Sequence, residues 1–546
     1  MTASASGTFP TRRAGLAVWT CVFILTLGTA GQVGVVWDEP FFWGKEDQIG
    51  AWFRSVVGSA EQRRAALSAE GLKRSWPFCI GTPHENPPVW AILGETGYAL
   101  AAPLLDELHA RRLTSTMLFA GVAAGLFVVA RNGWGTVPAF AALAAWVMHP
   151  RVFTHGRIGA IDMTMTAFWF FAACAFRRAC EGQGSTWSFG PLWGLAIMSK
   201  FTALVAGPAN AFWALAYQRP RAWKVLAWSI LLTPAVMVAV HPGWWPNPWE
   251  GISTAIDVHR HRHETQMVPT YYWGVVWPHA LPWHNTLVLT SCCTPPAWMI
   301  LASIGLIGFA AGKGRDSIMG WAVFNWTAMM IIRALPIAPG HDGIRQFLPA
   351  FPFLALMAAF GVATFQRLGT RLVSSDFGKT CAVYPTVLLA ATTAVSVWDS
   401  REAPLSYYSE LIGGLRGAQR LGLESTYWWE CVTPRFLDEM NRVLPPGAVV
   451  GLSSHGNIQD VFDRYQKWGE LRSDVTILAL DKYYSPARDA FRGPPPTHFL
   501  ILNREGMLFR RDWPINQRFR RLLNGPALAV VERQGVRLLA LVEARE

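Results

Sequence analysis

Long apolar segments, spread from near the N-terminus to about residue 398, constrain the fold of this chain more than any other feature. A helix needs roughly 20 apolar residues to cross the hydrocarbon of a bilayer. We identify about eleven candidate spans, at residues 14–36, 113–131, 135–150, 163–179, 188–200, 201–217, 222–241, 286–311, 317–335, 345–365 and 381–398. Only 15% of the residues are charged, against about 25% in soluble proteins. The sequence therefore predicts an α-helical polytopic membrane protein.

The basic residues indicate the orientation of these spans. If the N-terminus is cytoplasmic, eleven crossings place every strongly basic loop on the same side, as the positive-inside rule requires. Those loops lie near Arg131, Arg177-Arg178, Arg219 to Lys224, Lys313 to Arg315 and Arg367 to Lys379. Because the net charge of +12 is concentrated in such loops, it gives no support to nucleic acid as a partner. We expect a plasma (inner) membrane protein with an extracytoplasmic C-terminal region.

The first outer loop, residues 37–112, is expected to carry interfacial helices. Residues 87–105 are apolar enough to cross, but a crossing there would invert every later basic loop, so we expect a re-entrant or interfacial helix. A second, amphipathic helix is predicted around residues 48–68, and helices of this kind lie along the headgroup boundary. It would present Trp52 and Phe53 to lipid.

After residue 398 the apolar runs shorten and polar turns separate them. Two helical stretches are predicted at residues 405–420 and 433–443. Short strands are predicted at residues 448–452, 475–480, 498–502, 527–531 and 536–542. Gln534-Gly535 between the last two strands indicates a hairpin. We therefore expect a transmembrane catalytic domain over residues 1–398 and a soluble α/β domain over residues 399–546.

Two adjacent carboxylates, Asp38 and Glu39, directly follow the first span. Carboxylates near hydrocarbon are costly and are usually functional. One of them could act as a general base, taking a proton from an acceptor hydroxyl as it attacks a sugar carbon with a phosphate leaving group. The alternative is a water-exposed acidic pair at a helix end.

Polar residues in the outer loops offer further candidates. Glu85, in the segment His84-Glu85-Asn86-Pro87-Pro88, could bind a divalent metal or a sugar hydroxyl, or belong to a simple turn. Arg157 could hold a lipid phosphate through a forked, charge-assisted contact. It could equally form an ion pair with Asp162 at a helix start.

Lys200 and the segment Pro339 to Arg345, which contains His341, place charged groups close to apolar runs. A phosphate is one partner for such a lysine, and snorkelling to the interface is the other explanation. The alternating His259, His261 and His263 resemble a crude metal cluster, but their spacing matches no defined site. We favour a solvated basic stretch that binds anionic headgroups, beside an interfacial belt of tryptophans.

Five of these motifs, taken in order, resemble the GT-C glycosyltransferases. The closest resemblance is to the protein O-mannosyltransferase and aminoarabinose lipid A transferase group, and it covers roughly residues 14–365. The motifs are Asp38-Glu39, Glu85-Asn86-Pro87-Pro88, Arg157 with Asp162, Gly194-Leu195-Ala196 with Lys200-Phe201-Thr202, and Arg345-Gln346-Phe347-Leu348-Pro349.

The resemblance implies roles for individual residues. Asp38 would be the catalytic base, Glu39 an acceptor contact and Asp162 a second active-site carboxylate. Arg157, Lys200 and Arg345 would contact a polyprenyl phosphate, and His341 would contact substrate. Glu85 matches a metal-binding glutamate of the aminoarabinose branch, but the lysine that follows it there is Asn86 here, so metal use stays open, with Glu85, His259 and His261 as candidate ligands.

The function predicted is thus an inverting transfer of a sugar from a polyprenyl-phosphate donor to a protein, lipid or glycan acceptor, in contact with membrane lipids. Two alternatives are a transporter or flippase of lipid-linked sugars and a membrane-anchored glycan-binding protein. A transporter should show halves related by inverted topology, and the sequence shows none.

Overall fold

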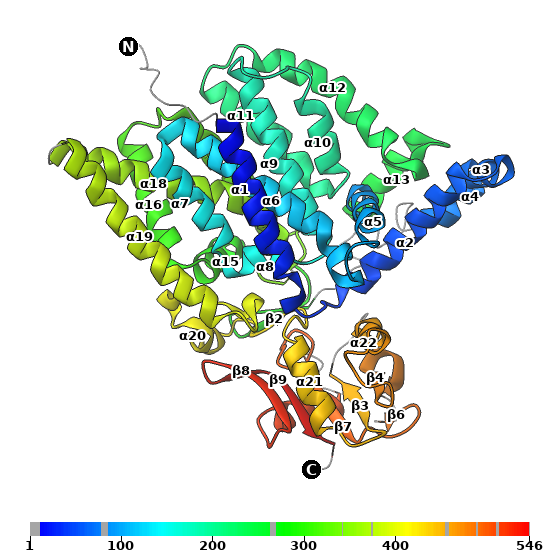
Figure 1. Cartoon of the computed structure of the whole chain (residues 1–546). Helices are drawn as coiled ribbons and strands as arrows, with labels where there is room; N and C mark the ends of the chain where they lie inside the picture. Colours follow the sequence, from blue (N-terminus) through cyan, green and yellow to red (C-terminus); the bar gives the residue numbers. More distant parts are fainter. Residues whose placement is uncertain are drawn as a thin grey trace.

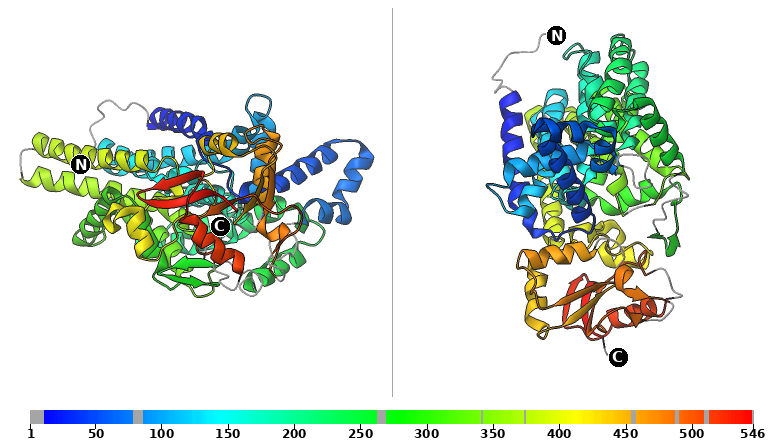
Figure 2. Two further views of the ribbon diagram at one scale, coloured as in Figure 1. Left: turned by 90° about the horizontal axis from the view of Figure 1, so that it is seen from below. Right: turned by 90° about the vertical axis from the view of Figure 1, so that its right-hand side faces the viewer.

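The computed structural model describes residues 11–77, 86–261, 269–340, 342–372, 375–453, 458–486, 490–508 and 513–544. A helical region extends to Asp399, and a C-terminal region containing a five-stranded sheet packs against one end of it (Figure 1). The right-hand view of Figure 2 shows the C-terminal region beneath the helical region from a second direction.

Helices lie at all the positions where the sequence predicts spans. They are α1 (Thr11–Gly28), α6 (Glu107–Trp134), α7 (Thr136–Val147), α8 (Pro150–His155), α9 (Ile161–Cys180), α10 (Phe189–Ile197), η3 (Phe201–Val205), α11 (Ala206–Ala216), α12 (Ala222–Ala239), α15 (Asn285–Cys293), α16 (Pro296–Ala311), α17 (Ser317–Ala334), η5 (Arg345–Ala350), α18 (Phe351–Leu372) and α19 (Ser375–Asp399). The predicted span 286–311 is two helices, α15 and α16. The break falls at Pro295 and Pro296, which have no backbone N–H to donate within a helix.

Four helical segments in the described part of the chain are long and apolar enough to cross a membrane: Arg12–Gln32, Glu107–Trp134, Ala222–Ala239 and Arg345–Thr370. Shorter apolar helices span Thr136–Val147, Phe201–Ala216, Pro296–Ala311 and Thr386–Asp399. The segment Arg345–Thr370 is the most enclosed of the long ones, with 94% of its apolar window buried. The helix α18 within it therefore forms the centre of the helical region.

The first outer loop is helical. It contains α2 (Asp38–Val57), α3 (Ala60–Leu67), α4 (Ala69–Ser75) and α5 (Val89–Ala101). With 13 residues, α5 is about 20 Å long, less than the roughly 30 Å of hydrocarbon that a spanning helix must cross. The predicted exposure of Trp52 is wrong, because this side chain is 4% exposed and its Nε1 donates to the Ala66 carbonyl.

Between α12 and α15 the chain forms η4 (Pro242–Trp244), α13 (Pro248–Arg260) and a two-stranded ribbon of β1 (Thr270–Tyr272) and β2 (Val275–Trp277). A short 3-10 helix, η1 (Ala30–Gln32), follows α1.

The C-terminal region has a mixed sheet in the order β4-β3-β7-β9-β8. Its strands are β3 (Val449–Leu452), β4 (Thr476–Ala479), β7 (His498–Leu502), β8 (Ala529–Arg533) and β9 (Val536–Glu543). The remaining elements are η6 (Pro404–Ser406), η7 (Glu410–Ile412), α20 (Gly414–Arg420), α21 (Pro434–Val443), α22 (Ile458–Lys467), α23 (Leu480–Tyr483), β5 (Tyr484–Ser485), β6 (Ala490–Phe491) and α24 (Pro514–Leu523). Strands β8 and β9 form the predicted hairpin. Both turn residues, Gln534 and Gly535, have positive φ, as a tight hairpin of matching twist requires.

The segment that joins α1 to α2 is enclosed by the C-terminal region. Gly34 N donates to the Glu430 carbonyl over 3.0 Å, and Trp37 N donates to the Trp428 carbonyl over 3.3 Å. Val35 N donates to the Tyr465 hydroxyl over 2.7 Å. These contacts fix the backbone immediately before Asp38.

Helices α16 and α18 approach each other closely at two glycines. A Cβ on Gly361 would lie 2.0 Å from the Leu301 carbonyl oxygen, and one on Gly305 would lie 2.3 Å from the Met357 carbonyl oxygen. Small residues allow this closeness, which gives apolar helices their van der Waals contact in a membrane.

We expect Gly361→Ala to lower thermal stability, because the added methyl must push α16 and α18 apart at a cost of about 1–3 kcal/mol. The matched control is Gly44→Ala in α2, where a Cβ would meet nothing within 4 Å. Thermal unfolding of the purified protein measures both changes, and equal unfolding temperatures for the two variants would contradict this account of the packing.

Candidate active site

Three charged side chains from distant parts of the sequence meet beside the C-terminal region. Arg345, the first residue of η5, contacts Asp38 Oδ2 with Nη2 at 2.7 Å and Asp162 Oδ2 with Nε at 2.8 Å. Asp38 is the first residue of α2, and Asp162 lies in the first turn of α9. A helix N-terminus favours a negative charge. The two helix starts therefore place two carboxylates on one guanidinium.

The guanidinium of Arg345 is also fixed from its other sides. Its Cζ lies 3.9 Å from the ring centroid of Trp428, and its Nη1 lies 3.5 Å from Asp342 Oδ2. Arginine stacks on aromatic faces while its N–H groups bind in the ring plane. The side chain is 9% exposed, so its orientation is set by the protein rather than by solvent.

Lys200 completes the charged cluster. It lies between α10 and η3, where its Nζ donates to Asp162 Oδ1 over 2.9 Å and to Gln346 Oε1 over 2.8 Å. Asp162 therefore bridges Lys200 and Arg345. Two cations and two carboxylates are held within one hydrogen-bonded network.

This network forms one wall of a cavity of about 430 Å³. Its lining residues are Asp38, Phe41, Phe42, Asn86, Pro87, Ile161, Lys200, Phe201, Thr202, Leu204, Val205, His259, Ile332, Arg333, Ile337, Ala338, Pro339, Arg345 and Gln346. Most of the rest of the wall is apolar. The Asp38 side chain keeps 24% of its surface exposed, whereas Asp162 keeps 3%. Asp38 is therefore the carboxylate that a molecule in the cavity can reach.

The surroundings of Asp38 favour its protonated form. Burial raises the pKa of Asp38 above its ordinary value, Arg345 opposes this shift, and the charges of Asp342 and Asp162 add to it. A carboxylate with a raised pKa is a stronger base than one in water, and groups of this kind are common in acid–base catalysis.

The structure places Glu39 away from the position that the sequence predicts. Expected to contact an acceptor, it is instead fully buried and forms a forked ion pair with Arg112, at 2.7 Å and 2.6 Å. Arg112 also donates to the carbonyls of Ala30, Val33 and Gly34. The pair therefore fixes the link between α1 and α2, and Glu39 does not line the cavity.

Arg157 is also absent from the cavity wall. Its Nη1 donates to the Thr29 carbonyl over 3.2 Å, and its guanidinium lies 4.4 Å from the Phe153 ring centroid. The expectation that Arg157 and Asp162 meet in one site is wrong. The turn between α8 and α9 directs Arg157 towards the end of α1, while α9 carries Asp162 to Arg345.

Those of the remaining predicted residues that the structure describes do not assemble a metal site. Glu85, His263 and His341 lie outside the described residues. His259 lines the cavity beside Phe201, whereas His261 is exposed and 3.3 Å from Asp257. Within the described part of the chain, no group of three or more His, Cys, Asp and Glu side chains could hold a metal ion.

Sequence reasoning missed three residues of this environment. Asp342 lies in the predicted segment Pro339 to Arg345 but has no predicted role, and neither Arg112 nor Arg504 is predicted. Arg504 donates to Asp342 Oδ1 over 2.6 Å from the C-terminal region. A buried arginine in a helix or a loop has no local sequence signal that separates it from a surface one, because its partner is distant in the chain.

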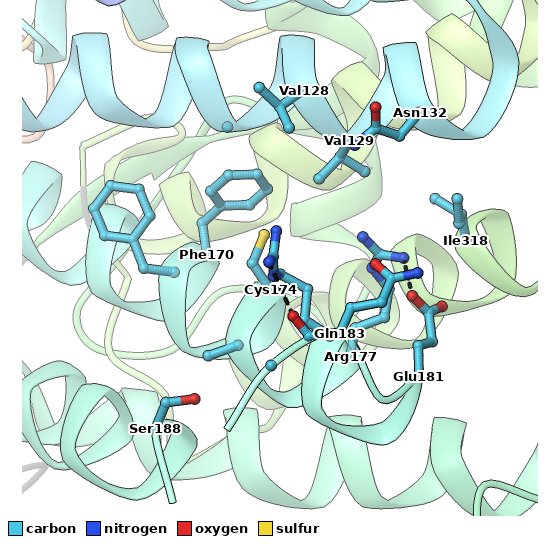
Figure 3. A pocket seen from close by; sticks show the side chains of 15 residues that line it. Val128, Val129, Asn132, Phe170, Cys174, Arg177, Glu181, Gln183, Ser188 and Ile318 are labelled. Carbon is cyan, nitrogen blue, oxygen red and sulfur yellow. Dashed lines mark hydrogen bonds and ion pairs between the residues drawn. The ribbon is translucent and has the colours of Figure 1, made fainter. Parts of the chain in front are cut away.

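A second cavity, of about 560 Å³, lies at the other end of α9 (Figure 3). Arg177 and Arg178 lie there, roughly 23 Å along the helix from Asp162 at 1.5 Å per residue. Its only acidic lining residue, Glu181, is paired with Arg177 at 2.7 Å. The cavity beside Asp38 is therefore the better candidate for a reaction site.

Comparison with known proteins gives a family match and a likeness to solved structures. Residues 85–245 match the family model described as dolichyl-phosphate-mannose-protein mannosyltransferase. No curated protein matches the chain. Two similar solved structures are of ArnT from Cupriavidus metallidurans. The structure bound to undecaprenyl phosphate has 14% identity, a TM-score of 0.47 and coverage of 98% of this chain and 99% of that one. The apo structure has 13% identity, a TM-score of 0.44 and coverage of 97% of both chains.

The family match identifies the class of protein as a membrane-embedded glycosyltransferase. The predicted class is thus confirmed, and the transporter alternative is not supported. Over residues 85–245 the resemblance to the dolichyl-phosphate-mannose-protein mannosyltransferase family is confirmed. This segment includes Asp162 and Lys200.

Replacing Glu39 by Gln should destabilise the fold, because it leaves Arg112 as a buried charge without a counter-ion. The expected cost is about 3–5 kcal/mol. The control is Glu402→Gln, which removes the carboxylate of the exposed pair with Arg435 and should cost at most about 1 kcal/mol. Thermal unfolding measures the stability of both variants. A similar loss of stability in the two would show that the buried pair has no special structural role.

Proposed function

We propose that the protein transfers a sugar from a polyprenyl-phosphate donor to an acceptor on a protein, lipid or glycan. The observation that carries this proposal is the position of Asp38, exposed to the cavity and in contact with Arg345, with Lys200 on the same wall. A base and two cations in one cavity suit a reaction in which a hydroxyl loses a proton and a phosphate leaves.

Arg345 and Lys200 are proposed to hold the donor phosphate. Guanidinium and ammonium groups form strong charge-assisted hydrogen bonds with phosphate oxygens. Both cations are already balanced by carboxylates, so the phosphate would bind to N–H groups that face the cavity while Asp162 keeps the two side chains in place. Asp162 is thus assigned a supporting role behind the cations.

The polyprenyl chain is proposed to leave the cavity between η3 and the end of α17. Leu204 and Ile337 line the cavity there and are 57% and 67% exposed. Large exposed apolar side chains are favourable where they meet lipid rather than water. The donor could then keep its tail in the bilayer while its phosphate reaches Arg345.

The proposed reaction is a single displacement at C1 of the sugar. The acceptor oxygen or nitrogen forms a bond to C1, the bond from C1 to the phosphate oxygen breaks, and Asp38 takes the acceptor proton. The products are the glycosylated acceptor and the polyprenyl phosphate. Attack from the face opposite the phosphate inverts the configuration at C1. Arg345 and Lys200 stabilise the charge that develops on the departing phosphate.

The orientation that we propose is cytoplasmic for the N-terminus and extracytoplasmic for the C-terminal region. Its support is the positive-inside distribution of the basic loops. With that orientation the cavity opens on the outer face. Residues 1–398 would form the catalytic membrane domain and residues 399–546 an extracytoplasmic domain in contact with it.

Replacing Asp38 by Asn should reduce sugar transfer from a polyprenyl-phosphate donor by roughly 10²–10⁴-fold, the usual contribution of a general base. The change preserves the shape of the side chain, so thermal unfolding should stay close to that of the wild type. Asp257→Asn is the control, because Asp257 is exposed and is not among the residues that line the cavity. Transfer by the Asp38 variant at the wild-type rate would refute its role as base.

The dependence of kcat/KM on pH should report the state of Asp38. The base must be deprotonated, and its pKa is raised by burial, so activity should fall as the pH drops through a value above the ordinary aspartate pKa of about 3.9. Rates measured from pH 4 to 8 on the wild type test this. An acidic limb at or below the ordinary value would contradict the assignment.

A further inference from the structure

Besides Trp428, the C-terminal region contributes an arginine to the charge network of the site. Arg504 follows β7, and its side chain is 4% exposed. Its Nη2 donates to Asp342 Oδ1 over 2.6 Å, and Asp342 Oδ2 lies 3.5 Å from Arg345 Nη1. A single carboxylate therefore connects an arginine of the C-terminal region to the arginine that binds Asp38.

Several contacts hold Arg504 in this position. Its Nη1 donates to the Tyr427 carbonyl over 2.6 Å, and its guanidinium lies 4.6 Å from the ring centroid of Trp37. Trp37 directly precedes Asp38 in the chain. The guanidinium thus rests between the backbone that leads to Asp38 and the segment that carries Trp428, the ring beneath Arg345.

The loop that carries Arg504 is anchored by a buried carboxylate. Glu424 is 3% exposed, and it accepts the backbone N–H of Glu505 at 2.7 Å and that of Gly506 at 2.8 Å. Two hydrogen bonds from adjacent backbone N–H groups to one buried side chain fix the loop. The position of Arg504 is therefore determined by a dedicated arrangement within the C-terminal region.

The contact between Arg504 and Asp342 affects the charge that Arg345 offers to Asp38. Three carboxylates, those of Asp38, Asp162 and Asp342, lie within 3.5 Å of the guanidinium of Arg345. Like charges around one cation compete for it, and each disfavours ionisation of the others. Arg504 supplies a second cation to Asp342 and leaves more of the Arg345 charge for the other two.

We propose that Arg504 is a positioning residue of the active site, and that it acts by holding Asp342 so that Arg345 stays bound to Asp38 and Asp162. The inference rests on the proposed function and gives the C-terminal region a part in catalysis. Docking of this region completes the charge balance around the base. No substrate contact by Arg504 is required.

The test uses four forms of the full-length enzyme: the wild type, Arg504→Met, Asp342→Asn and the double variant. The charges with the largest effect on Asp38 are those of Arg345, Asp342 and Asp162. The other charged or titratable residues that line its cavity are Lys200, Arg333 and His259. In Arg504→Met the unpaired Asp342 competes for Arg345, so kcat/KM should fall by at least about tenfold and its acidic limb should move to higher pH. In the double variant the competing charge is gone, so activity should return to within about threefold of that of Asp342→Asn.

Arg533→Met is the matched control. Arg533 is also a buried arginine of the C-terminal region that binds the helical region, with Nη2 3.0 Å from Asp399 Oδ2, but it lies outside the charge network of Arg345. Its loss should lower the unfolding temperature without moving the acidic limb. Comparing the two arginine variants separates loss of docking from loss of charge balance.

The outcomes distinguish this inference from the proposed function. A wild type that transfers no sugar from a polyprenyl-phosphate donor would refute the function and the inference together. Two results with an active wild type would refute the inference alone. One is that the acidic limb of Arg504→Met, like that of Arg533→Met, does not move. The other is that kcat/KM of the double variant is no higher than that of Arg504→Met. If Arg504→Met does not fold, Asp342→Asn decides by itself: its acidic limb should move to lower pH, and an unchanged limb would overturn the proposal.

Discussion

The site depends on one guanidinium that neutralises carboxylates which would otherwise repel each other. Arg345 contacts Asp38 and Asp162 at hydrogen-bond distance. Arg345 compensates the charge of Asp38, and together with Lys200 it compensates that of Asp162. Removing a charge from water costs several kcal/mol unless a partner compensates. The starts of α2 and α9 and the entry to α18 are therefore held together by charge, while the helices behind them pack through apolar contacts.

A second buried ion pair, between Glu39 and Arg112, fixes the backbone next to Asp38. Glu39 and Arg112 join the start of α2 to α6 and to the carbonyl groups that follow α1. Adjacent carboxylates in the sequence thus serve opposite purposes: one is enclosed and fully paired, whereas Asp38 faces a cavity. The α-helical geometry produces this division, because consecutive side chains point about 100° apart around the axis and cannot share one environment.

Much of the fold could be predicted, because hydropathy and turn chemistry are local. The apolar segments and the hairpin at Gln534-Gly535 are examples. Helices α22 and α24 were missed although Ile458, Val461, Phe462 and Tyr465 in the first follow helical spacing. The site was predicted in part: motif order indicated Asp38, Asp162, Lys200 and Arg345. The positions of Arg157, Glu39 and Arg504 depend on partners more than 70 residues away in the chain, and no local pattern encodes such pairs.

The contact between Arg504 and Asp342 has a consequence for biosynthesis. A ribosome makes the chain from its N-terminal side, so Arg504 is made 162 residues after Asp342. Until Arg504 has been synthesised and β7 has paired with its neighbouring strands, Asp342 lacks this partner and competes for Arg345. The helices that are made first thus lack their final charge arrangement until the C-terminal region has folded against them.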